Sequence, residues 1–332
     1  MKQLRRVRIA GLSTYVPPRV LNNADLEKLV ETSDEWILQR TGIRERHIVD
    51  DGMATSDMAK VASLGAIAQA GIAATDVGFI VVGTTTPDTI FPSTACVLQD
   101  KIGATRSWGF DLGAACSGFT YALTVGMQAV ATGSTDYALV VGADTMSSII
   151  DYTDRTTCIL FGDGAGAAVL APAGEDEPAI IDFAHEIDGS GGPALCMPAG
   201  GSRMPASRET VDNRMHYVKQ DGQAVFKFAV RKTEEISRRL LERNGLDPSE
   251  VDLFVSHQAN RRIINAAAER LGLPDSKVVI NLERFGNTTG ATIPLALADA
   301  MADGRLKRGD LVLLASVGAG FTVGAVLLKW GI

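Results

Sequence analysis

The segment Gly71-Ile-Ala-Ala-Thr-Asp-Val-Gly-Phe-Ile-Val81 returns in pattern 174 positions later, as Gly245-Leu-Asp-Pro-Ser-Glu-Val-Asp-Leu-Phe-Val255. Each copy has a glycine and an aliphatic residue, then an acid, a valine and a buried apolar run. The same offset relates the apolar run Tyr137–Gly142 to Leu311–Ser316. Matches that recur in the same order predict a duplicated α/β unit.

A third match concerns the start of a helix built from small residues. Cys116-Ser-Gly118 has its counterpart, shifted by two positions, near Thr288-Thr-Gly290. Two similar halves would place the loops at their strand ends face to face, where an active site is expected. The Pro-, Gly- and acid-rich segment Ala171–Pro178 predicts the junction, which gives an N-terminal half, 1–175, and a C-terminal half, 176–332.

Apolar runs separated by helical patterns predict an α/β fold whose strands are mostly parallel and covered by helices. A long segment, 189–214, is rich in Gly, Pro, Ser and Met, and we expect a surface loop or a loop that covers the site. The individual predictions are strands at Val7–Gly11, Phe79–Gly83 and Ala167–Leu170, and helices at Asn22–Ile37, Thr55–Ala70, Ser93–Ile102 and Arg261–Leu271.

Composition and charge exclude several classes of protein. The chain has 332 residues, of which 46% are hydrophobic and 21% charged, and its net charge is −7. An acidic chain has no overall positive field to hold nucleic acid or an anionic membrane, so an acidic partner needs a local basic patch. Four scattered cysteines without a C-x-x-C pair predict neither disulfides nor a zinc site. We expect a cytoplasmic protein without a membrane span or signal peptide.

Cys116 lies in Gly109-Phe-Asp-Leu-Gly-Ala-Ala-Cys-Ser-Gly-Phe-Thr-Tyr-Ala-Leu123, which reads as a strand, a run of small residues and a helix. A thiol in the first turn of a helix lies near unpaired N–H groups and the positive end of the dipole, which favours the thiolate nucleophile. Free cysteines are nevertheless often inert, buried and apolar, and this stretch alone favours the inert interpretation.

Two polar residues at strand ends in the second half change that balance. His257 follows the apolar run Val251–Val255, where a neutral imidazole N–H can donate to an oxyanion. Asn287 follows Gly286 at a third predicted strand end and offers an amide donor, although Asn after Gly is more often only a turn residue. One thiol and two neutral donors suit acyl transfer with a stabilised thioester enolate.

Several segments together resemble those of β-ketoacyl-acyl-carrier-protein synthase III, the initiating condensing enzyme of type II fatty-acid synthesis in the thiolase-like superfamily. The resemblance runs from the first strand to the C-terminus, and it implies a five-layered α-β-α-β-α fold. It rests on Thr32–Trp36, Arg40–Arg46, Gly113–Leu123, Phe161–Ala168, His257–Asn260 and Gly286–Thr288.

The resemblance implies a reaction in two steps. A primer acyl group from acyl-CoA is transferred to Cys116, and malonyl on the acyl carrier protein then loses CO2 while His257 and Asn287 stabilise the enolate. The carbanion attacks the Cys116 thioester. The backbone amides of Cys116 and Ala319 would form the oxyanion hole for acyl transfer, and the resemblance implies neither a metal nor a permanently bound cofactor.

The family pattern also assigns residues to the CoA arm and to partners. Carrier docking maps onto Lys227, Arg262 and Arg270, and Phe91 corresponds to a residue that closes the acyl pocket across a homodimer. The CoA and pantetheine residues are Trp36, Arg40, Arg155, Gly222, Phe226, Asn260 and Arg262, with adenine between Trp36 and Arg155.

The resemblance leaves alternative functions open, and the chain differs from the usual family sequence at two positions. A plant-type (type III) polyketide synthase or another acyl-CoA condensing enzyme uses the same three residue types, and a non-catalytic carrier-binding homologue is a third possibility. The segment Gly162–Gly166 suggests a nucleotide loop, but an apolar strand pattern follows it where a phosphate loop needs a helix. Val317 and Val323 replace aromatic residues that the family usually has on either side of its C-terminal glycine loop.

Overall fold

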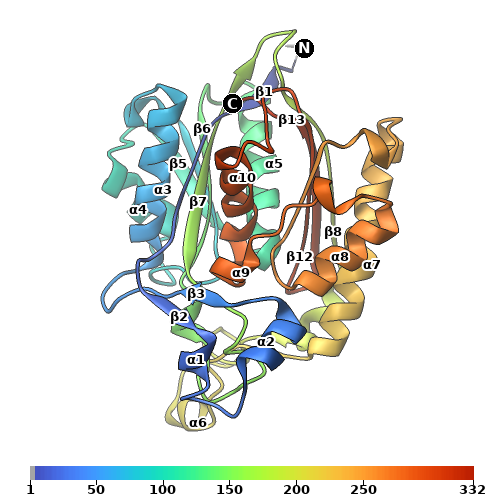
Figure 1. Cartoon of the computed structure of the whole chain (residues 1–332). Coiled ribbons are helices and arrows are strands. Elements are labelled where there is room, and N and C mark those ends of the chain that lie inside the picture. Colours follow the sequence, from blue (N-terminus) through green and yellow to red (C-terminus); the bar gives the residue numbers. More distant parts are fainter. Residues whose placement is uncertain (1–3) are drawn as a thin grey trace.

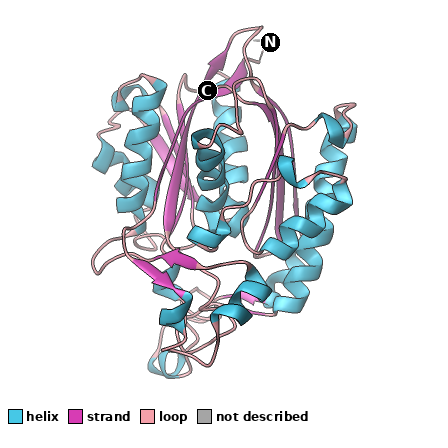
Figure 2. Ribbon diagram, in the orientation of Figure 1, coloured by secondary structure: helices cyan, strands magenta, loops and turns pink. Residues whose placement is uncertain are grey.

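The computed structural model describes residues 4–332, which form two β-sheets interleaved with helices in five layers (Figure 1, Figure 2). Helices α3 and α4 cover one sheet, α7 and α8 cover the other, and α5 and α10 lie between the two sheets. The strands are β1 (Arg6–Tyr15), β2 (Val20–Asn22), β3 (Glu45–His47), β4 (Phe79–Gly83), β5 (Trp108–Leu112), β6 (Ala138–Asp144), β7 (Gly164–Ala173), β8 (Ile180–Ile187), β9 (Leu195–Cys196), β10 (Lys219–Gln220), β11 (Leu253–Ser256), β12 (Leu311–Gly318) and β13 (Thr322–Lys329).

The helices of the layers begin and end close to where the apolar periodicity of the sequence predicts. α3 and α8 have the predicted bounds, and α4 begins one residue later, because Ser93 is its N-cap. The α-helices are α1 (Asn23–Leu26), α2 (Asp34–Thr41), α3 (Thr55–Ala70), α4 (Thr94–Ile102), α5 (Gly118–Ala131), α6 (Arg208–Asp212), α7 (Gly222–Arg243), α8 (Arg261–Leu271), α9 (Leu282–Phe285) and α10 (Thr292–Ala302).

The two sheets repeat one topology. The strand order is β1-β7-β6-β4-β5 in the first sheet and β8-β13-β12-β11 in the second, where an isolated bridge between Phe254 and Val278 takes the place of a fifth strand. The short 3-10 turns Ala74–Asp76 and Pro248–Glu250 precede β4 and β11 at the predicted offset of 174. The duplication predicted from the sequence is therefore present. The division into 1–175 and 176–332 is kept as a proposal.

The sheets are mixed, and the parallel pairing that the sequence predicts is found on one side of each sheet. β4 pairs in parallel with β5 and β6, and β11 pairs in parallel with β12, whereas β7 and β1, like β13 and β8, are antiparallel. Only Ala319, Gly320 and Phe321 separate β12 from β13. A connection that short permits a hairpin but no parallel crossover, which needs a dozen residues or more.

Three apolar clusters fill the spaces between the layers. One lies between the sheets around α5 and α10, and one lies under each outer pair of helices. Because α5 is covered on both sides by sheets, small residues allow close packing. A Cβ on Gly126 would lie 2.6 Å from Val140 Cγ2.

Three segments differ from the sequence-based expectations. Asn22–Ile37 contains two short helices, α1 and the first half of α2, because Asn22 and Ser33 each cap a new start. The 189–214 segment contains a 3-10 turn, β9 and α6, and β9 pairs with β10. The residues before Asn287 form the short helix α9 and not the predicted strand end. Among residues 4–332, no helix is long and apolar enough to cross a membrane.

Candidate active site

Cys116 lies in a tight turn between β5 and α5. It is the middle residue of the 3-10 turn Ala115–Ser117, which directly precedes the helix, so Cys116 does not lie in the first turn of α5. The backbone packs closely here. A Cβ on Gly83 would lie 2.6 Å from the carbonyl carbon of Gly118, and one on Gly318 would lie 2.7 Å from Cys116 N. The small residues around Cys116 are therefore required for segments of both halves to meet at the thiol.

The protonation state of Cys116 differs from the sequence-based expectation. The residue is 7% exposed, and burial raises the pKa of its thiol to about 12. The Asp144 carboxylate adds to this rise, whereas hydrogen bonds from the Cys116 backbone and the Asn287 side chain oppose it. Desolvation outweighs the helix-start effect, so the resting site holds a thiol and the proton must leave as the sulfur attacks.

His257 directly follows β11, as the sequence predicts. Its backbone N–H donates to Ala315 O (2.8 Å), which continues the pairing with β12, and its ring Nδ1 lies 2.7 Å from Thr292 Oγ1. The side chain is buried, and burial lowers the pKa of His257 to about 3. The imidazole is therefore neutral at physiological pH, which suits a hydrogen-bond donor and not a fixed cation.

Asn287 follows α9 and reaches the site from the second half. Its backbone N–H donates to Leu160 O (2.8 Å), and its side-chain Oδ1 accepts from the Thr289 N–H (2.9 Å). With Oδ1 held by Thr289, the amide nitrogen is the free end of the side chain, and the Asn287 side chain is one of the groups that lower the pKa of the Cys116 thiol. This places a neutral donor directly beside the thiol.

Asp144, at the end of β6, joins the two halves below the site. It is fully buried, and its Oδ1 accepts from Thr85 N (2.7 Å) and from the hydroxyl groups of Thr84, Thr85 and Thr86. Its Oδ2 accepts from Gly290 N (3.1 Å) and from the Thr289 hydroxyl. One carboxylate thus ties the strand-end loop of the first half to the turn that follows Asn287.

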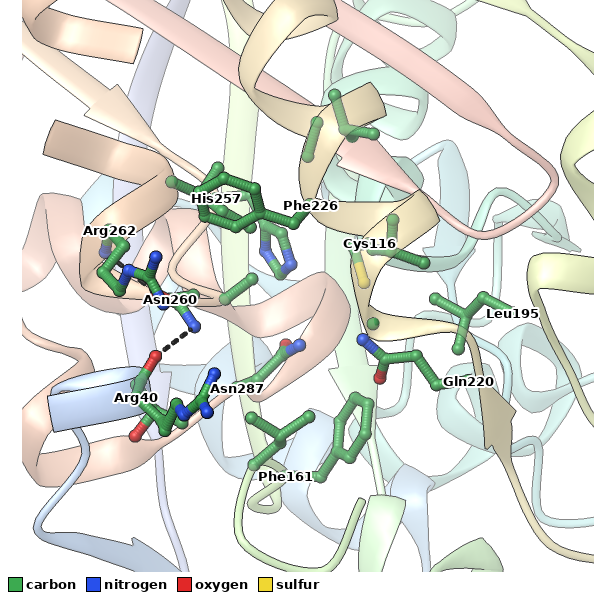
Figure 3. Close-up of a pocket in the computed structure, with 18 of the residues that line it drawn as sticks. Arg40, Cys116, Phe161, Leu195, Gln220, Phe226, His257, Asn260, Arg262 and Asn287 are labelled. Carbon is green, nitrogen blue, oxygen red and sulfur yellow. Dashed lines mark hydrogen bonds between the residues drawn. The ribbon is translucent and has the colours of Figure 1, made fainter. Parts of the chain in front are cut away.

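A single cavity of about 660 Å³ joins the three residues to the predicted CoA arm, and Figure 3 shows Cys116, His257 and Asn287 facing it. Most of its wall is apolar, with a few polar groups at the catalytic end, as is typical of substrate sites. The predicted site residues that line it are Trp36, Arg40, Cys116, Gly222, Phe226, His257, Asn260, Arg262 and Asn287.

Arginine guanidinium groups lie over aromatic rings at the outer end of the cavity, and of these arginines Arg155 is not part of the cavity wall. The guanidinium carbons of Arg155 and Arg40 lie 5.1 and 5.7 Å from the centroid of the Trp36 ring. Asn260 Nδ2 donates to Arg40 O (2.9 Å), the dashed line in Figure 3. The Arg262 guanidinium lies 5.3 Å from the ring centroid of Phe226. Two guanidinium groups beside an indole suit a planar base next to phosphates.

The other predicted site residues lie outside the cavity wall. Gly318 lines the cavity whereas its neighbour Ala319 does not, so the oxyanion role of the Ala319 amide stays a prediction. Phe91 is 83% exposed on a loop between β4 and α4. Lys227 and Arg270 are exposed on α7 and α8, as is Arg262.

Sequence reasoning missed several residues that line the cavity or contact its catalytic residues. Leu195 and Gln220 come from the paired strands β9 and β10. Leu195 lies within the segment 189–214 that was expected to cover the site, and Gln220 follows that segment. Thr292, which contacts His257, lies on α10 in a stretch with no polar pattern of its own. The remaining missed lining residues are Thr41, Thr156, Ile159, Leu160, Phe161, Gln223, Val225, Ala229, Thr233, Ser256, Ala259, Ile263, Gly318 and Phe321, whereas Val317, already noted as a departure from the family, also lines the cavity.

The glycine-rich segment 162–166 is closely packed backbone, as predicted. β7 begins at Gly164, and a Cβ on Gly162 would lie 2.5 Å from Phe285 O, so the segment has no room for a phosphate. Within residues 4–332, no group of three or more His, Cys, Asp or Glu side chains is arranged to hold a metal ion.

Comparison with known proteins finds relatives that match nearly the whole chain. The family described as 3-oxoacyl-[acyl-carrier-protein (ACP)] synthase III matches residues 110–189, and its C-terminal model matches residues 241–330. A β-ketoacyl-[acyl-carrier-protein] synthase III of Solibacter usitatus is 59% identical over 327 residues, which cover 98% of this chain and 99% of that protein.

Two solved structures have the same fold. The 3-oxoacyl-[acyl-carrier-protein] synthase III from Aquifex aeolicus VF5 is 42% identical with a TM-score of 0.90, covering 98% of this chain and 100% of that one. The priming β-ketosynthase from the R1128 polyketide biosynthetic pathway is 34% identical with a TM-score of 0.91, covering 100% of this chain and 98% of that one.

The duplicated five-layered fold, with a buried cysteine, a histidine and an asparagine at its centre, defines a thiolase-like condensing enzyme. Enzymes of this class are acyltransferases. The chain belongs to the β-ketoacyl-acyl-carrier-protein synthase III family.

Proposed function

We propose that this enzyme condenses a primer acyl-CoA with malonyl-acyl carrier protein through an acyl-Cys116 intermediate, as the first step of fatty-acid synthesis. The observation that carries the proposal is one continuous cavity. Cys116, His257 and Asn287 line one end of it, and Trp36, Arg40 and Arg262 line the other. Such a cavity can hold a nucleotide at its mouth and a thioester at its base.

In the first half-reaction, Cys116 Sγ attacks the thioester carbon of acyl-CoA. A new C–S bond forms, the bond to the CoA sulfur breaks, and the thiol proton passes to the departing CoA sulfur. The resting thiol, whose pKa burial raises to about 12, supports a proton transfer coupled to attack. The amides of Cys116 and Ala319 are the proposed donors to the carbonyl oxygen during this step.

In the second half-reaction, malonyl carried on the acyl carrier protein loses CO2. The electron pair of the broken C–C bond becomes a thioester enolate, whose oxygen accepts from His257 Nε2–H and Asn287 Nδ2–H. The enolate carbon then attacks the acyl-Cys116 carbonyl, and the cysteine sulfur leaves and takes up a proton. Neutral donors in a buried site stabilise the negative charge that develops on the enolate oxygen, because little water is present to screen their hydrogen bonds.

The same proposal includes partners and the environment of the enzyme. Exposed Lys227, Arg262 and Arg270 on α7 and α8 are the proposed docking surface for the acidic carrier protein. Exposed Phe91 is proposed to reach the acyl pocket of a second copy in a homodimer. The proposed cycle uses no metal or permanently bound cofactor and takes place in the cytoplasm.

Intact-protein mass spectrometry after incubation with short acyl-CoAs tests the nucleophile. We expect one acyl adduct on the wild-type chain and none on Cys116→Ala. Cys158→Ala, which removes a buried cysteine outside the cavity wall, is the matched control and should keep the adduct. An adduct that persists in Cys116→Ala would refute the assignment.

Separate assays of the two half-reactions test the roles of the donors His257 and Asn287. His257→Ala and Asn287→Ala should abolish the decarboxylation of malonyl-acyl carrier protein and largely spare the acylation of Cys116. Equal loss of both half-reactions would show that the assigned roles are wrong.

A second candidate is the priming of polyketide synthesis, which the similarity to the R1128 priming β-ketosynthase supports. The site chemistry is the same in both cases, and only the primer and the carrier protein differ. A panel of acyl-CoAs, from acetyl to medium-chain and branched, offered with carrier proteins of each pathway, distinguishes the two by the pair that gives the highest kcat/KM.

A further inference from the structure

The single turn from Thr289 to Thr292 holds the side chains of both proposed enolate donors. The Thr289 N–H donates to Asn287 Oδ1 (2.9 Å), which leaves the amide nitrogen of Asn287 to face the cavity. The Thr292 hydroxyl lies 2.7 Å from His257 Nδ1. Thr289 is anchored in turn by its hydroxyl, which donates to the buried Asp144 carboxylate. The turn is therefore tied to the other half of the molecule.

The hydroxyl of Thr292 has one proton and two acceptors in reach. Besides His257 Nδ1, its oxygen lies 3.0 Å from Thr289 O. If the proton goes to Thr289 O, Nδ1 must carry a hydrogen and donate to Thr292, which leaves Nε2 without one. If the proton goes to Nδ1, the hydrogen of the neutral ring is on Nε2, where it can donate into the cavity.

Two observations favour the second arrangement. Thr289 O already accepts from the backbone N–H of Thr292, so it does not depend on the hydroxyl. The 2.7 Å separation from His257 Nδ1 is typical of a bond in which O–H donates, whereas N–H donors usually lie at about 2.9 to 3.0 Å. His257 and Thr292 are both buried, so water offers Nδ1 no ready substitute.

We propose that Thr292 is the positioning residue that fixes the tautomer of His257, because its hydroxyl donates to Nδ1 and keeps the ring hydrogen on Nε2. This inference rests on the proposed function, in which Nε2–H is a donor to the enolate. Thr292 does not touch the substrate in this scheme and acts only through His257.

Nuclear magnetic resonance of the wild-type enzyme tests the tautomer without any assay of activity. The chain has four histidines, so ¹⁵N-histidine labelling gives few signals, and His257→Asn identifies those of His257. At pH 7 we expect a protonated Nε2 and an unprotonated Nδ1 that accepts a hydrogen bond. A protonated Nδ1 would overturn the proposal.

The variant Thr292→Val tests the consequence of this tautomer for catalysis. It replaces the hydroxyl by a methyl group of similar size. Malonyl decarboxylation should fall roughly tenfold, the effect of one lost hydrogen bond in a buried site. Acylation of Cys116 should stay within about twofold of the wild type, because that step does not use Nε2–H in this scheme. Thr292→Ser keeps the hydroxyl and should restore decarboxylation.

Thr288→Val, at the residue that directly precedes this turn, is the matched control. Thr288 is fully buried and its Oγ1 has no hydrogen-bond partner, so loss of this hydroxyl should leave both half-reactions unchanged. Wild-type decarboxylation in Thr292→Val, or equal loss in Thr288→Val, would contradict the proposal. If the proposed function itself is wrong, the wild type will show no acylation or decarboxylation, and the resonance experiment still decides the tautomer.

Discussion

Ala115 and Thr289, 174 positions apart, have the same left-handed backbone conformation, with φ of 46° and 47°. Each begins a 3-10 turn of three residues that leads into a central helix, α5 after Ala115 and α10 after Thr289. The two residues therefore occupy equivalent places in the duplicated halves. One lies directly before Cys116, and the other holds Asn287 through its N–H. Left-handed backbone costs energy for residues other than glycine, and it is common at functional sites.

Substitution of Ala115 by glycine should relieve this cost. Left-handed alanine is unfavourable by about 1–2 kcal/mol, whereas glycine costs roughly 0.5–1 kcal/mol in chain entropy, so we expect Ala115→Gly to keep or slightly raise the free energy of unfolding. Ala114 has a φ of −138° and is buried, so Ala114→Gly should lower that energy by about 1 kcal/mol. Denaturant unfolding measures both, and a larger loss in Ala115→Gly would contradict the strain argument.

Sequence patterns predicted the duplication because it depends on local periodicity and on an offset that can be counted. The sequence comparison matched Gly118 with Gly290, which is two positions out of register. In the structure Gly118 corresponds to Thr292, because these two residues begin the equivalent helices α5 and α10. The antiparallel pairing of β1 with β7 and of β8 with β13 was not predicted, because apolar runs do not reveal the direction of pairing.

At the site, the three reactive residues and the neutral state of His257 were predicted from the sequence, but the protonation of Cys116 was not. The rule for helix starts predicts a lowered pKa for Cys116, and burial, which depends on residues from both halves, raises it instead. Thr292 was missed for a similar reason. Its contact with His257 joins residues 35 positions apart, and no local pattern marks it.

The Trp36 stack should contribute to binding of the nucleotide part of the substrate and not to chemistry. Loss of one stacking contact of this kind costs about 1 kcal/mol or more, so Trp36→Ala should raise KM for acyl-CoA roughly fivefold to tenfold with little change in kcat. Steady-state acylation kinetics measures this. An acyl thioester of N-acetylcysteamine, which has no nucleotide, is the control and should be unaffected. An equal effect on both substrates would show that Trp36 shapes the inner cavity instead.

Val317 should limit the size of the primer, because it lines the same cavity as Cys116 and His257. Val317→Phe adds volume to the wall, and we expect kcat/KM for medium-chain acyl-CoA to fall at least about tenfold relative to acetyl-CoA. Val317→Ala should shift the preference the other way. Val323 is buried beside Val317 on β13 and does not line the cavity, so Val323→Ala should leave the primer profile unchanged. A profile that changes only in Val323→Ala would contradict this role.

His185 should make the fold less stable in mild acid. It lies on β8 with its ring 4.3 Å from that of Tyr121, its Nε2 lies 2.8 Å from Thr124 Oγ1, and its Nδ1 is buried without a partner. Burial lowers the pKa of His185 to about 4, whereas the unfolded chain has a value near 6.5. Between these pH values the unfolded chain binds a proton that the folded chain does not, so stability falls as the pH drops from about 6.5 to about 4.

His185→Gln removes this proton uptake. The wild type should lose up to about 3 kcal/mol more than the variant between pH 7 and pH 4, because one unit of pKa shift corresponds to about 1.4 kcal/mol. Thermal unfolding followed by circular dichroism across that range measures the difference. From pH 7 to pH 9 the Tm curves of the two proteins should run parallel, since His185 is neutral in both states there. Curves that stay parallel down to pH 4 would show that His185 is protonated as readily in the folded protein as in the unfolded chain.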